Sequence, residues 1–291
     1  MNSSSDSATG ASHPTDVCQA GVGPFVTFSS YELAGRRITW QAREHRKGLL
    51  RIARAIEQLP VPAWQTRHYN QAVGATFALG AFLFIVGSLL SFLPQASPKL
   101  AAWANLIFFL GSIPFTVAAY MQHFQAANAA FFSLDPAKPQ PTTASMKLLG
   151  WRPRDIGWVS TFTQFLGTLA FNISTLGAIE IINPWYLQDA IVWLPDVLGS
   201  MLFLLSAYLA FVEANHAAWC WKPVNIAWQI VFVNLIGCIA FMVAACTDYV
   251  PLHGPTPWVA WLSNFQLLIG ATCFLIGALL SIRESQAADC S

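Results

Sequence analysis

Long apolar runs dominate the chain, and one short pattern recurs inside them. The stretch Leu-Gly-Ser-Met-Leu-Phe-Leu-Leu-Ser at 198–206 has five near-copies, each with Leu or Ile, then Gly, Phe four residues after the Gly, and a small residue seven after it. Steps of four and seven stay on one face of a helix, so each copy places its Gly, Phe and small residue on one stripe. The glycines of the six copies are Gly80, Gly111, Gly167, Gly199, Gly237 and Gly270.

The stripe indicates helix packing inside a lipid bilayer. Lipid tails are as apolar as Leu, so burial alone does not drive helices together there, whereas close packing at small residues does. The Gly and the small residue open a groove and the Phe forms a knob, a heptad-type geometry that favours crossings near about +20°. A pore lined by the stripe is the alternative, and we favour packing.

The apolar runs predict an all-α protein, a bundle of six membrane-spanning helices. Runs of about 18 or more apolar residues are typical of spans. The connections between them alternate between short Pro-rich links and a longer segment, so the six spans form three tandem helical hairpins. The spans cover about 70–93, 100–123, 157–182, 190–213, 224–246 and 258–282, within hairpins at 69–123, 157–214 and 223–283.

The remaining segments are expected to lie in the cytoplasm. Residues 1–24, rich in Ser, Thr, Gly and Ala, are expected to be disordered. Residues 25–68 form a basic juxtamembrane segment, in which apolar residues between Leu49 and Leu59 recur at helical spacing and predict a short amphipathic helix. Residues 124–156 are expected to form a loop and residues 284–291 a tail.

Charge orients the chain. Only 10% of its residues are Asp, Glu, Lys or Arg, against about 25% in a soluble domain. Of the 15 Lys and Arg residues, 14 fall on the side of the predicted spans that holds both termini, and only Lys99 falls on the opposite side. Lys and Arg collect on the cytoplasmic side of a membrane, so we expect a multi-pass protein of the inner or plasma membrane with both termini in the cytoplasm. The formal charge of +1 predicts no steering of nucleic acid.

The basic part of the juxtamembrane segment, residues 36–54, has two interpretations. It binds anionic lipid in one of them. In the other, which we favour, it is a topology signal with an ordinary solvated face. The lipid bilayer is the expected partner, and a homo-oligomer is compatible with the sequence.

Polar residues within the spans fall into two groups of candidate site residues. Three helices carry a polar residue three positions before the Gly of the pattern: Gln164, Asp196 and Asn234. The other three helices carry Phe77, Phe108 and Leu267 at that position, and Asn105 and Asn264 lie elsewhere on their helices. Because neighbouring spans run antiparallel, the polar residues lie at two depths. The outer group is Asp196, Asn105 and Asn264, and the inner group is Gln164 and Asn234.

Asp196 is the most informative of these residues. A carboxylate inside a span costs about 2.5–3.5 kcal/mol on insertion scales, and such residues are functional candidates by default. However, Pro195 precedes it, and Pro followed by an acid is also ordinary chemistry for the first turn of a helix. Both interpretations stay open.

Catalytic or cofactor chemistry is not indicated. The sequence has no GxxxxGK[ST], GxGxxG, HExxH or GxSxG motif, and its six cysteines show no CxxC or metal spacing. Glu213, His123 and His216 fall at the ends of spans and are expected at the membrane interface. We expect no cofactor, no metal and no enzymatic activity.

Several stretches resemble bacterial multi-pass proteins with YrhK-like hairpin domains. They are Asn105 to Gln122, Gln164 to Thr175, Asp196 to Glu213 and Asn264 to Leu280, together with His45-Arg46-Lys47-Gly48. The resemblance covers most of residues 43–283 and implies an integral membrane protein, without an activity, cofactor or catalytic residue to carry over. Asp196 and Asn172 lie at positions that match the YrhK-like sequence pattern.

Two functions are expected from these observations. The first is a non-enzymatic membrane protein whose main chemistry is helix packing. The alternative is a transporter or channel for a small solute or ion, with Asp196, Asn105 and Asn264 as its entry site. A polar cavity reaching Asp196 would favour the alternative.

Overall fold

The computed structural model describes residues 15–33, 36–49, 61–93, 98–129, 146–179, 184–249 and 257–288. Three strands come first: β1 (Thr15–Val22), β2 (Phe25–Leu33) and β3 (Arg36–Gln41). The helical elements are α1 (Ala42–Lys47), η1 (Ala63–Gln65), α3 (Arg67–Ser91), α4 (Pro98–Ala127), α5 (Ile156–Gly177), α6 (Trp185–Gln188), the π-helical η3 (Asp189–Trp193), α7 (Leu194–Asn215), α8 (Ile226–Thr247) and α9 (Pro257–Ala287).

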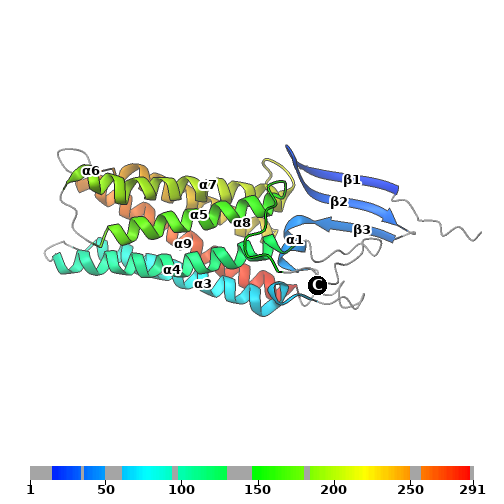
Figure 1. The fold of residues 1–291 in the computed structure, drawn as a ribbon, viewed down its shortest axis with the longest axis horizontal. Coiled ribbons are helices and arrows are strands. Elements are labelled where there is room, and N and C mark those ends of the chain that lie inside the picture. The colour runs from blue at the N-terminus through cyan, green and yellow to red at the C-terminus, as the bar shows by residue number, and fades with distance from the viewer. Residues whose placement is uncertain are drawn as a thin grey trace, which may run out of the picture.

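Six long helices form a closed ring. The helices α3 and α4, α5 and α7, and α8 and α9 pack as hairpins, while contacts of α4 with α5, α7 with α8 and α9 with α3 close the ring. The helices lie along the long axis of the molecule, with β1–β3 and α1 at one end and α6 at the other (Figure 1). We call these the sheet end and the α6 end.

Five of the described helical stretches are long and apolar enough to cross a membrane: α3, α4, α6 through α7, α8 and α9. The helix α5 lies beside them in the bundle (Figure 1). It differs in composition, because Ser, Thr, Gln and Asn recur along its 22 residues. The mainly helical fold and the presence of several apolar spans are therefore confirmed, and the sixth span stays a prediction.

The glycines of the recurring pattern lie where paired helices approach most closely. A Cβ on Gly80 would lie 3.0 Å from the carbonyl oxygen of Gly111. The same contact, at 3.1 Å, joins Gly167 to Gly199 in the second hairpin. In the third hairpin Gly237 and Gly270 make the equivalent contact at 3.1 Å. Each of the three hairpins therefore uses its two glycines to bring two backbones together.

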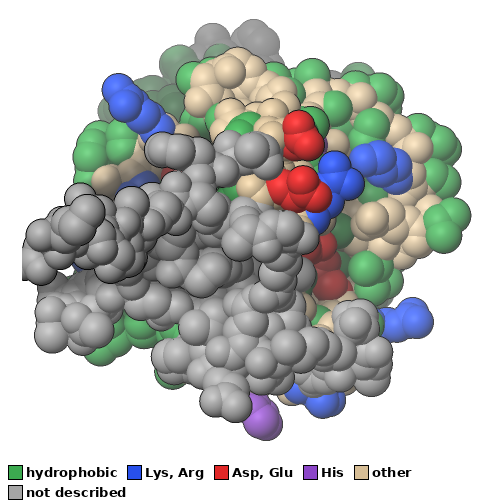
Figure 2. Space-filling model, turned by 90° about the vertical axis from the view of Figure 1, so that its right-hand side faces the viewer, with side chains coloured by type: hydrophobic (Ala, Val, Ile, Leu, Met, Phe, Trp, Pro, Cys, Tyr) green, Lys and Arg blue, Asp and Glu red, His purple; other side chains and the backbone are tan. Residues whose placement is uncertain are grey.

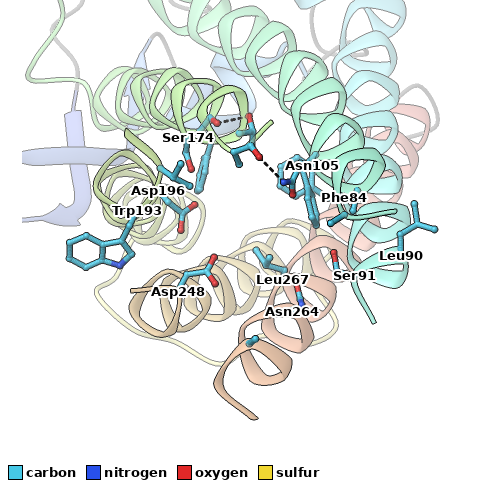
Figure 3. A pocket seen from close by; sticks show the side chains of 18 of the residues that line it. Phe84, Leu90, Ser91, Asn105, Ser174, Trp193, Asp196, Asp248, Asn264 and Leu267 are labelled. Carbon is cyan, nitrogen blue, oxygen red and sulfur yellow. Dashed lines mark hydrogen bonds between the residues drawn. The ribbon is translucent and has the colours of Figure 1, made fainter. Parts of the chain in front are cut away.

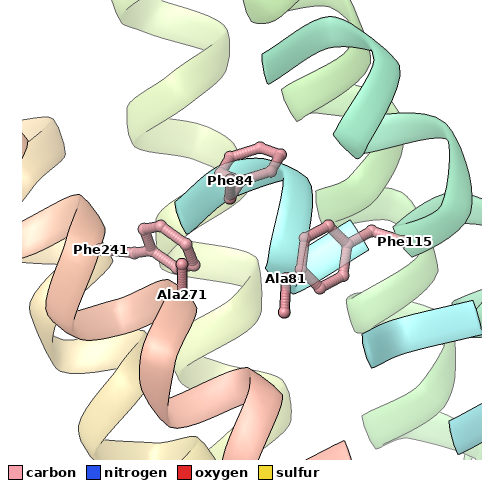
Figure 4. Packing of buried hydrophobic residues seen from close by; sticks show 5 residues of the cluster. All are labelled: Ala81, Phe84, Phe115, Phe241 and Ala271. Atoms are coloured by element: carbon pink, nitrogen blue, oxygen red, sulfur yellow. The ribbon is translucent and has the colours of Figure 1, made fainter. Parts of the chain in front are cut away.

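The phenylalanines of the pattern meet on the bundle axis. We call Phe84, Phe115, Phe171, Phe203, Phe241 and Phe274 the aromatic layer. Their rings form a closed circuit of neighbours with centroid separations between 4.9 and 6.1 Å, which is the range of favourable aromatic pairs. Phe84, Phe115 and Phe241 enclose Ala81 and Ala271 in the largest buried cluster (Figure 4).

A second contact recurs where α5 and α8 begin. The indole of Trp158 donates a hydrogen bond to a backbone carbonyl of the preceding linker at 3.0 Å, and Trp228 does the same at 3.0 Å. Asp155 and Asn225 cap the two helices by accepting from backbone N–H groups of the first turn, as such residues commonly do. The linkers before hairpins two and three are thus fixed in the same way.

The N-terminal region differs from the sequence-based expectation. Residues 15–22, expected to be disordered, form β1, and β1–β3 make an antiparallel sheet. His216 attaches this sheet to the bundle, with Nδ1 3.0 Å from Thr27 Oγ1 and Nε2 3.3 Å from Gln41 Oε1. The amphipathic helix expected between Leu49 and Leu59 lies largely outside the described residues.

Two predicted boundaries also change. The helix α4 extends to Ala127, beyond the expected start of a loop at 124, and α9 extends to Ala287, into the expected tail. These extensions carry polar side chains such as Gln125 and Glu284 into contact with other elements. Hydropathy marks where the apolar run ends, but the helix continues because its later residues have partners.

We expect Gly199→Leu to destabilise the protein. The backbone of Gly167 is 3.1 Å from a Cβ at this position, and overpacking costs typically about 1–3 kcal/mol. Thermal unfolding in detergent measures the effect. Ala75→Leu, at an exposed position of α3, is the control and should leave the melting temperature nearly unchanged. Equal melting temperatures for the two variants would contradict the packing role of the glycines.

Candidate functional site

A polar chamber of about 310 Å³ opens at the α6 end of the bundle. Figure 3 shows Asp196 of α7 and Asp248, the C-cap of α8, pointing into it from neighbouring helices. Asn105 of α4 and Asn264 of α9 line the same chamber. The structure thus brings the three residues of the predicted outer group together and adds a second carboxylate.

Asp196 lies in the first turn of α7, but the backbone before it is already helical. Helical structure runs from Trp185 to Asn215, and the π-helical turn Asp189–Trp193 precedes Leu194 and Pro195. A π-helical turn shifts the hydrogen-bond pattern, which accommodates the missing N–H of a proline. Asp196 is therefore roughly 16 Å along a continuous helix at about 1.5 Å per residue. The preceding helical turns distinguish this position from a free helix start, and both interpretations of Asp196 stay predictions.

The neighbours of Asp196 are held by hydrogen bonds. Asn105 donates from Nδ2 to the carbonyl of Ala178 at 2.6 Å, which ties α4 to the end of α5. Ser263 of α9 donates from Oγ to the carbonyl of Ala244 at 3.4 Å, which ties α9 to the last turn of α8, next to Asp248. Sequence reasoning missed Asp248 because it falls just after the predicted fifth span. The sequence did contain a signal for it, because the predicted topology places the acidic residue Asp248 at the same end of the bundle as Asp196.

A second chamber, of about 110 Å³, lies at the sheet end. Gln164 of α5 and Asn234 of α8, the predicted inner group, both line it, together with Ser160 and Ser206. The hydroxyl of Ser206 donates to the carbonyl of Ser160 at 2.7 Å, which joins α7 to α5. The outer and inner polar groups therefore belong to separate chambers.

The position three residues before each Gly faces the axis in all six helices. In α3, α5 and α8 it lines the sheet-end chamber with Phe77, Gln164 and Asn234. In α4, α7 and α9 it lines the α6-end chamber with Phe108, Asp196 and Leu267. One register position thus supplies the walls of both chambers.

A void of about 20 Å³ lies in the aromatic layer between the two chambers. Seven phenylalanines surround it, the six of the layer and Phe77. Ser112, Gln164 and Thr168 are the polar residues of its wall. The layer separates the chambers but does not fill the axis completely.

Helix α1 forms part of the wall of the sheet-end chamber through Arg43, Arg46 and Lys47. Arg46 binds Glu213 of α7 through two hydrogen bonds, at 2.7 and 3.2 Å. Arg43 and Lys47 share Glu284 of α9, with Lys47 Nζ 2.6 Å from Oε2. Figure 2, which looks onto this end, shows basic and acidic side chains lying side by side.

Burial at the sheet end changes three expectations. Glu213, expected at the membrane interface, is only 1% exposed. His123, expected there as well, is fully buried and donates from Nε2 to the carbonyl of Leu149 at 2.8 Å. Arg43, Arg46 and Lys47 are buried rather than solvated. Sequence reasoning assigned them to a solvated face because their partners lie far away in sequence.

The backbone of α1 is fixed as firmly as its side chains. Gln65 donates from Nε2 to the carbonyl of His45 at 3.1 Å, and Asn70 donates from Nδ2 to the carbonyl of Lys47 at 2.8 Å. Gly48 ends the helix with a φ of 65°, and a Cβ there would lie 2.6 Å from the backbone of Gln65. Only glycine combines this positive φ with so close an approach.

Burial and pairing shift the pKa values of α1 in opposite directions. Burial opposes the charge of Arg43, but Glu284 outweighs it, so the pKa of Arg43 is raised above its usual value. Burial also dominates at Lys47, where Glu284 compensates only in part, and the pKa falls to about 8. Arg43 and Lys47 compete for one carboxylate, so the lysine is the less well stabilised cation.

Among the residues that the structure describes, no group of three or more His, Cys, Asp or Glu side chains is placed to hold a metal ion. The two chambers offer carboxylates, amides and hydroxyls to a solute. Together they define a class: a helical membrane protein with a polar chamber at each end of its axis.

The comparison with known families identifies one part of this architecture. Residues 69–126 match the family model described as YrhK-like protein. This stretch is the hairpin of α3 and α4, which is thus a YrhK-like domain, and the resemblance expected from the sequence is confirmed there. No curated protein and no solved structure matches the chain.

We expect Arg46→Met to destabilise the protein strongly, because it leaves Glu213 buried without its partner. Breaking a buried pair in this way costs about 3–5 kcal/mol. The double variant Arg46→Met/Glu213→Met should recover much of the loss. Thermal unfolding in detergent compares them, with Arg37→Met, at an exposed strand position, as control. A double variant less stable than the single one would contradict the pairing argument.

Lys47 gives a pH-dependent prediction. Its folded pKa of about 8 is below the ordinary value of 10.5, so between these pH values the unfolded state binds more protons. Stability should therefore rise as pH increases from about 8 to about 10.5. The melting temperature of the wild type, followed over this window, should rise relative to that of Lys47→Met, which cannot titrate. Parallel profiles would show that Lys47 titrates normally.

Proposed function

We propose that the chain is a multi-pass integral membrane protein, with all six long helices across the bilayer, that moves a small cationic solute along the axis of the ring. The proposal rests on one observation: polar chambers lie at both ends of the axis and one aromatic layer separates them. Transporters commonly place binding sites between repeated helical units.

The acidic character of the α6-end chamber favours a cation over an anion. Asp196 and Asp248 both face this chamber, and the amides of Asn105 and Asn264 add neutral oxygen atoms. A carboxylate within a span is costly unless it has a function or a partner. A chamber lined by one sign of charge raises the local concentration of ions of opposite sign.

The distribution of basic residues supports an orientation. Every described Lys and Arg except Lys99 belongs to the sheet end of the molecule. By the positive-inside rule, the sheet end lies in the cytoplasm of a cell whose inner or plasma membrane holds the protein, and the α6 end faces outward. Anionic lipid is then proposed to contact exposed basic residues such as Arg37 and Lys222, rather than the buried Arg43, Arg46 and Lys47.

A non-enzymatic packing role is the second candidate. The glycine contacts and the continuous circuit of aromatic rings favour it, because a bundle of this density can act by holding partners or by forming a homo-oligomer. It leaves Asp196 and Asp248 without a task. We therefore rank it below transport.

Flux through purified protein in liposomes tests the proposal. We expect uptake of a small cation by the wild type, and a fall of about tenfold in Asp196→Asn, corresponding to about 1.4 kcal/mol in the barrier. Asp189→Asn is the matched control, since it removes a carboxylate from the same helical stretch outside the chamber wall. Equal flux in the two variants, or no cation flux above that of empty liposomes, would contradict transport through this chamber.

A further inference from the structure

The cavity volumes restrict what can pass along the axis. The chambers measure about 310 and 110 Å³, but the void in the aromatic layer measures about 20 Å³. A cavity needs about 10–15 Å³ to hold one water molecule, so by size this mainly apolar void has room for one water at most and for no hydrated ion. A metal cation would have to lose its hydration shell among seven phenyl rings.

A hydrogen bond joins the α6-end chamber to this void. Thr175 of α5 lines the chamber, and Ser112 of α4 lines the void. The Thr175 hydroxyl lies 3.2 Å from the Ser112 hydroxyl. Its one proton is shared between this contact and the nearer carbonyl of Phe171, at 2.7 Å, and Ser112 donates to the carbonyl of Phe109 at 2.8 Å. The two hydroxyls therefore carry a polar connection past the edge of the aromatic layer.

One side chain joins the void to the sheet-end chamber. Gln164 lines both cavities, so its amide is shared between them. Thr168, one turn further along α5, lines the void as well. Polar residues of α5 thus occur in the walls of all three cavities, from Thr175 through Thr168 and Gln164 to Ser160.

A buried polar atom without a partner lies at the same interface of α4 and α5. Asn172 of α5 donates from Nδ2 to Thr116 Oγ1 of α4 at 2.8 Å. Its buried Oδ1 has no hydrogen-bond partner in the described part of the chain. Buried polar atoms of this kind are usually satisfied by ordered water.

We infer that the species moved along the axis is the proton, relayed by hydroxyls and water beside α5. This inference rests on the proposed transport function and names its substrate. Asp196 takes a proton from hydronium at the α6 end, which leaves water, and releases a proton through chamber water to the Thr175 hydroxyl. The hydroxyls of Thr175 and Ser112 each accept one proton and give up another, so that a proton reaches the water in the void. That water, positioned by Gln164, releases a proton to water in the sheet-end chamber. Each oxygen that gains a proton gives one up, so the step needs no further reactant.

The full-length protein in liposomes, with a pH-sensitive dye inside and a potassium diffusion potential set by valinomycin, tests the inference. We expect proton influx in the wild type and no uptake of radioactive sodium. Gln164→Leu and Thr175→Val should each lower the proton influx by about tenfold or more. Thr272→Val is the matched control, because Thr272 is exposed on α9 and donates only to its own helix, to the Leu268 carbonyl.

A variant with a wider void tests independently whether the size of the void excludes sodium. Phe171→Ala/Phe203→Ala removes two stacked rings of the aromatic layer and should admit sodium that the wild type excludes. Each variant is compared only when it elutes as a single species in detergent and melts cooperatively. A wild type that passes sodium and protons alike would overturn the inference from the size of the void.

The outcomes separate this inference from the proposed function. Sodium uptake that depends on Asp196, without proton influx, would retain cation transport and overturn the proton relay. Proton influx that Gln164→Leu and Thr175→Val leave unchanged would overturn the route along α5. The absence of both proton and cation flux would overturn the inference together with the proposed function.

Discussion

The close approach of helix pairs at glycine is the constraint on which the rest of the structure depends. Inside a bilayer, apolar side chains gain little by leaving lipid for protein, so helices associate through close contact. In each of the three hairpins a glycine lies against the backbone of the glycine opposite it. That contact sets the spacing of the pair, and the Phe one turn further along each helix then reaches the axis and meets the others in the aromatic layer.

The sheet end is stabilised by a different interaction. There, α1 places three cations against Glu213 and Glu284, and all five side chains are buried or nearly so. Such pairs stabilise less than their Coulomb attraction suggests, because desolvation offsets much of it. They do specify position, since a displaced α1 would leave two buried carboxylates unpaired. The sheet-end chamber therefore has its cationic wall only while α1 is docked.

Sequence reasoning located the features that depend on local periodicity and missed those that depend on distant partners. The glycine pattern, the apolar runs and the two groups around Asp196 and Gln164 all come from spacing along single helices. The strand β1 was missed because sheet pairing is non-local and its residues look like a polar tail. The burial of Arg46 could not be foreseen, since its partner lies 167 residues away. Asp248 was missed because hydropathy places it outside a span.

Packing and chemistry occupy different positions of the same repeated pattern. The Gly, the Phe and the small residue must be kept in every helix, because each contacts a neighbour. The residue three before the Gly lines a chamber and differs from helix to helix: it is Phe77, Phe108, Leu267, Asn234, Gln164 or Asp196. The three apolar members also pack against the central cluster around Phe84 and Phe115. The bundle therefore combines a glycine contact that is the same in all three hairpins with one position per helix at which the chamber walls differ.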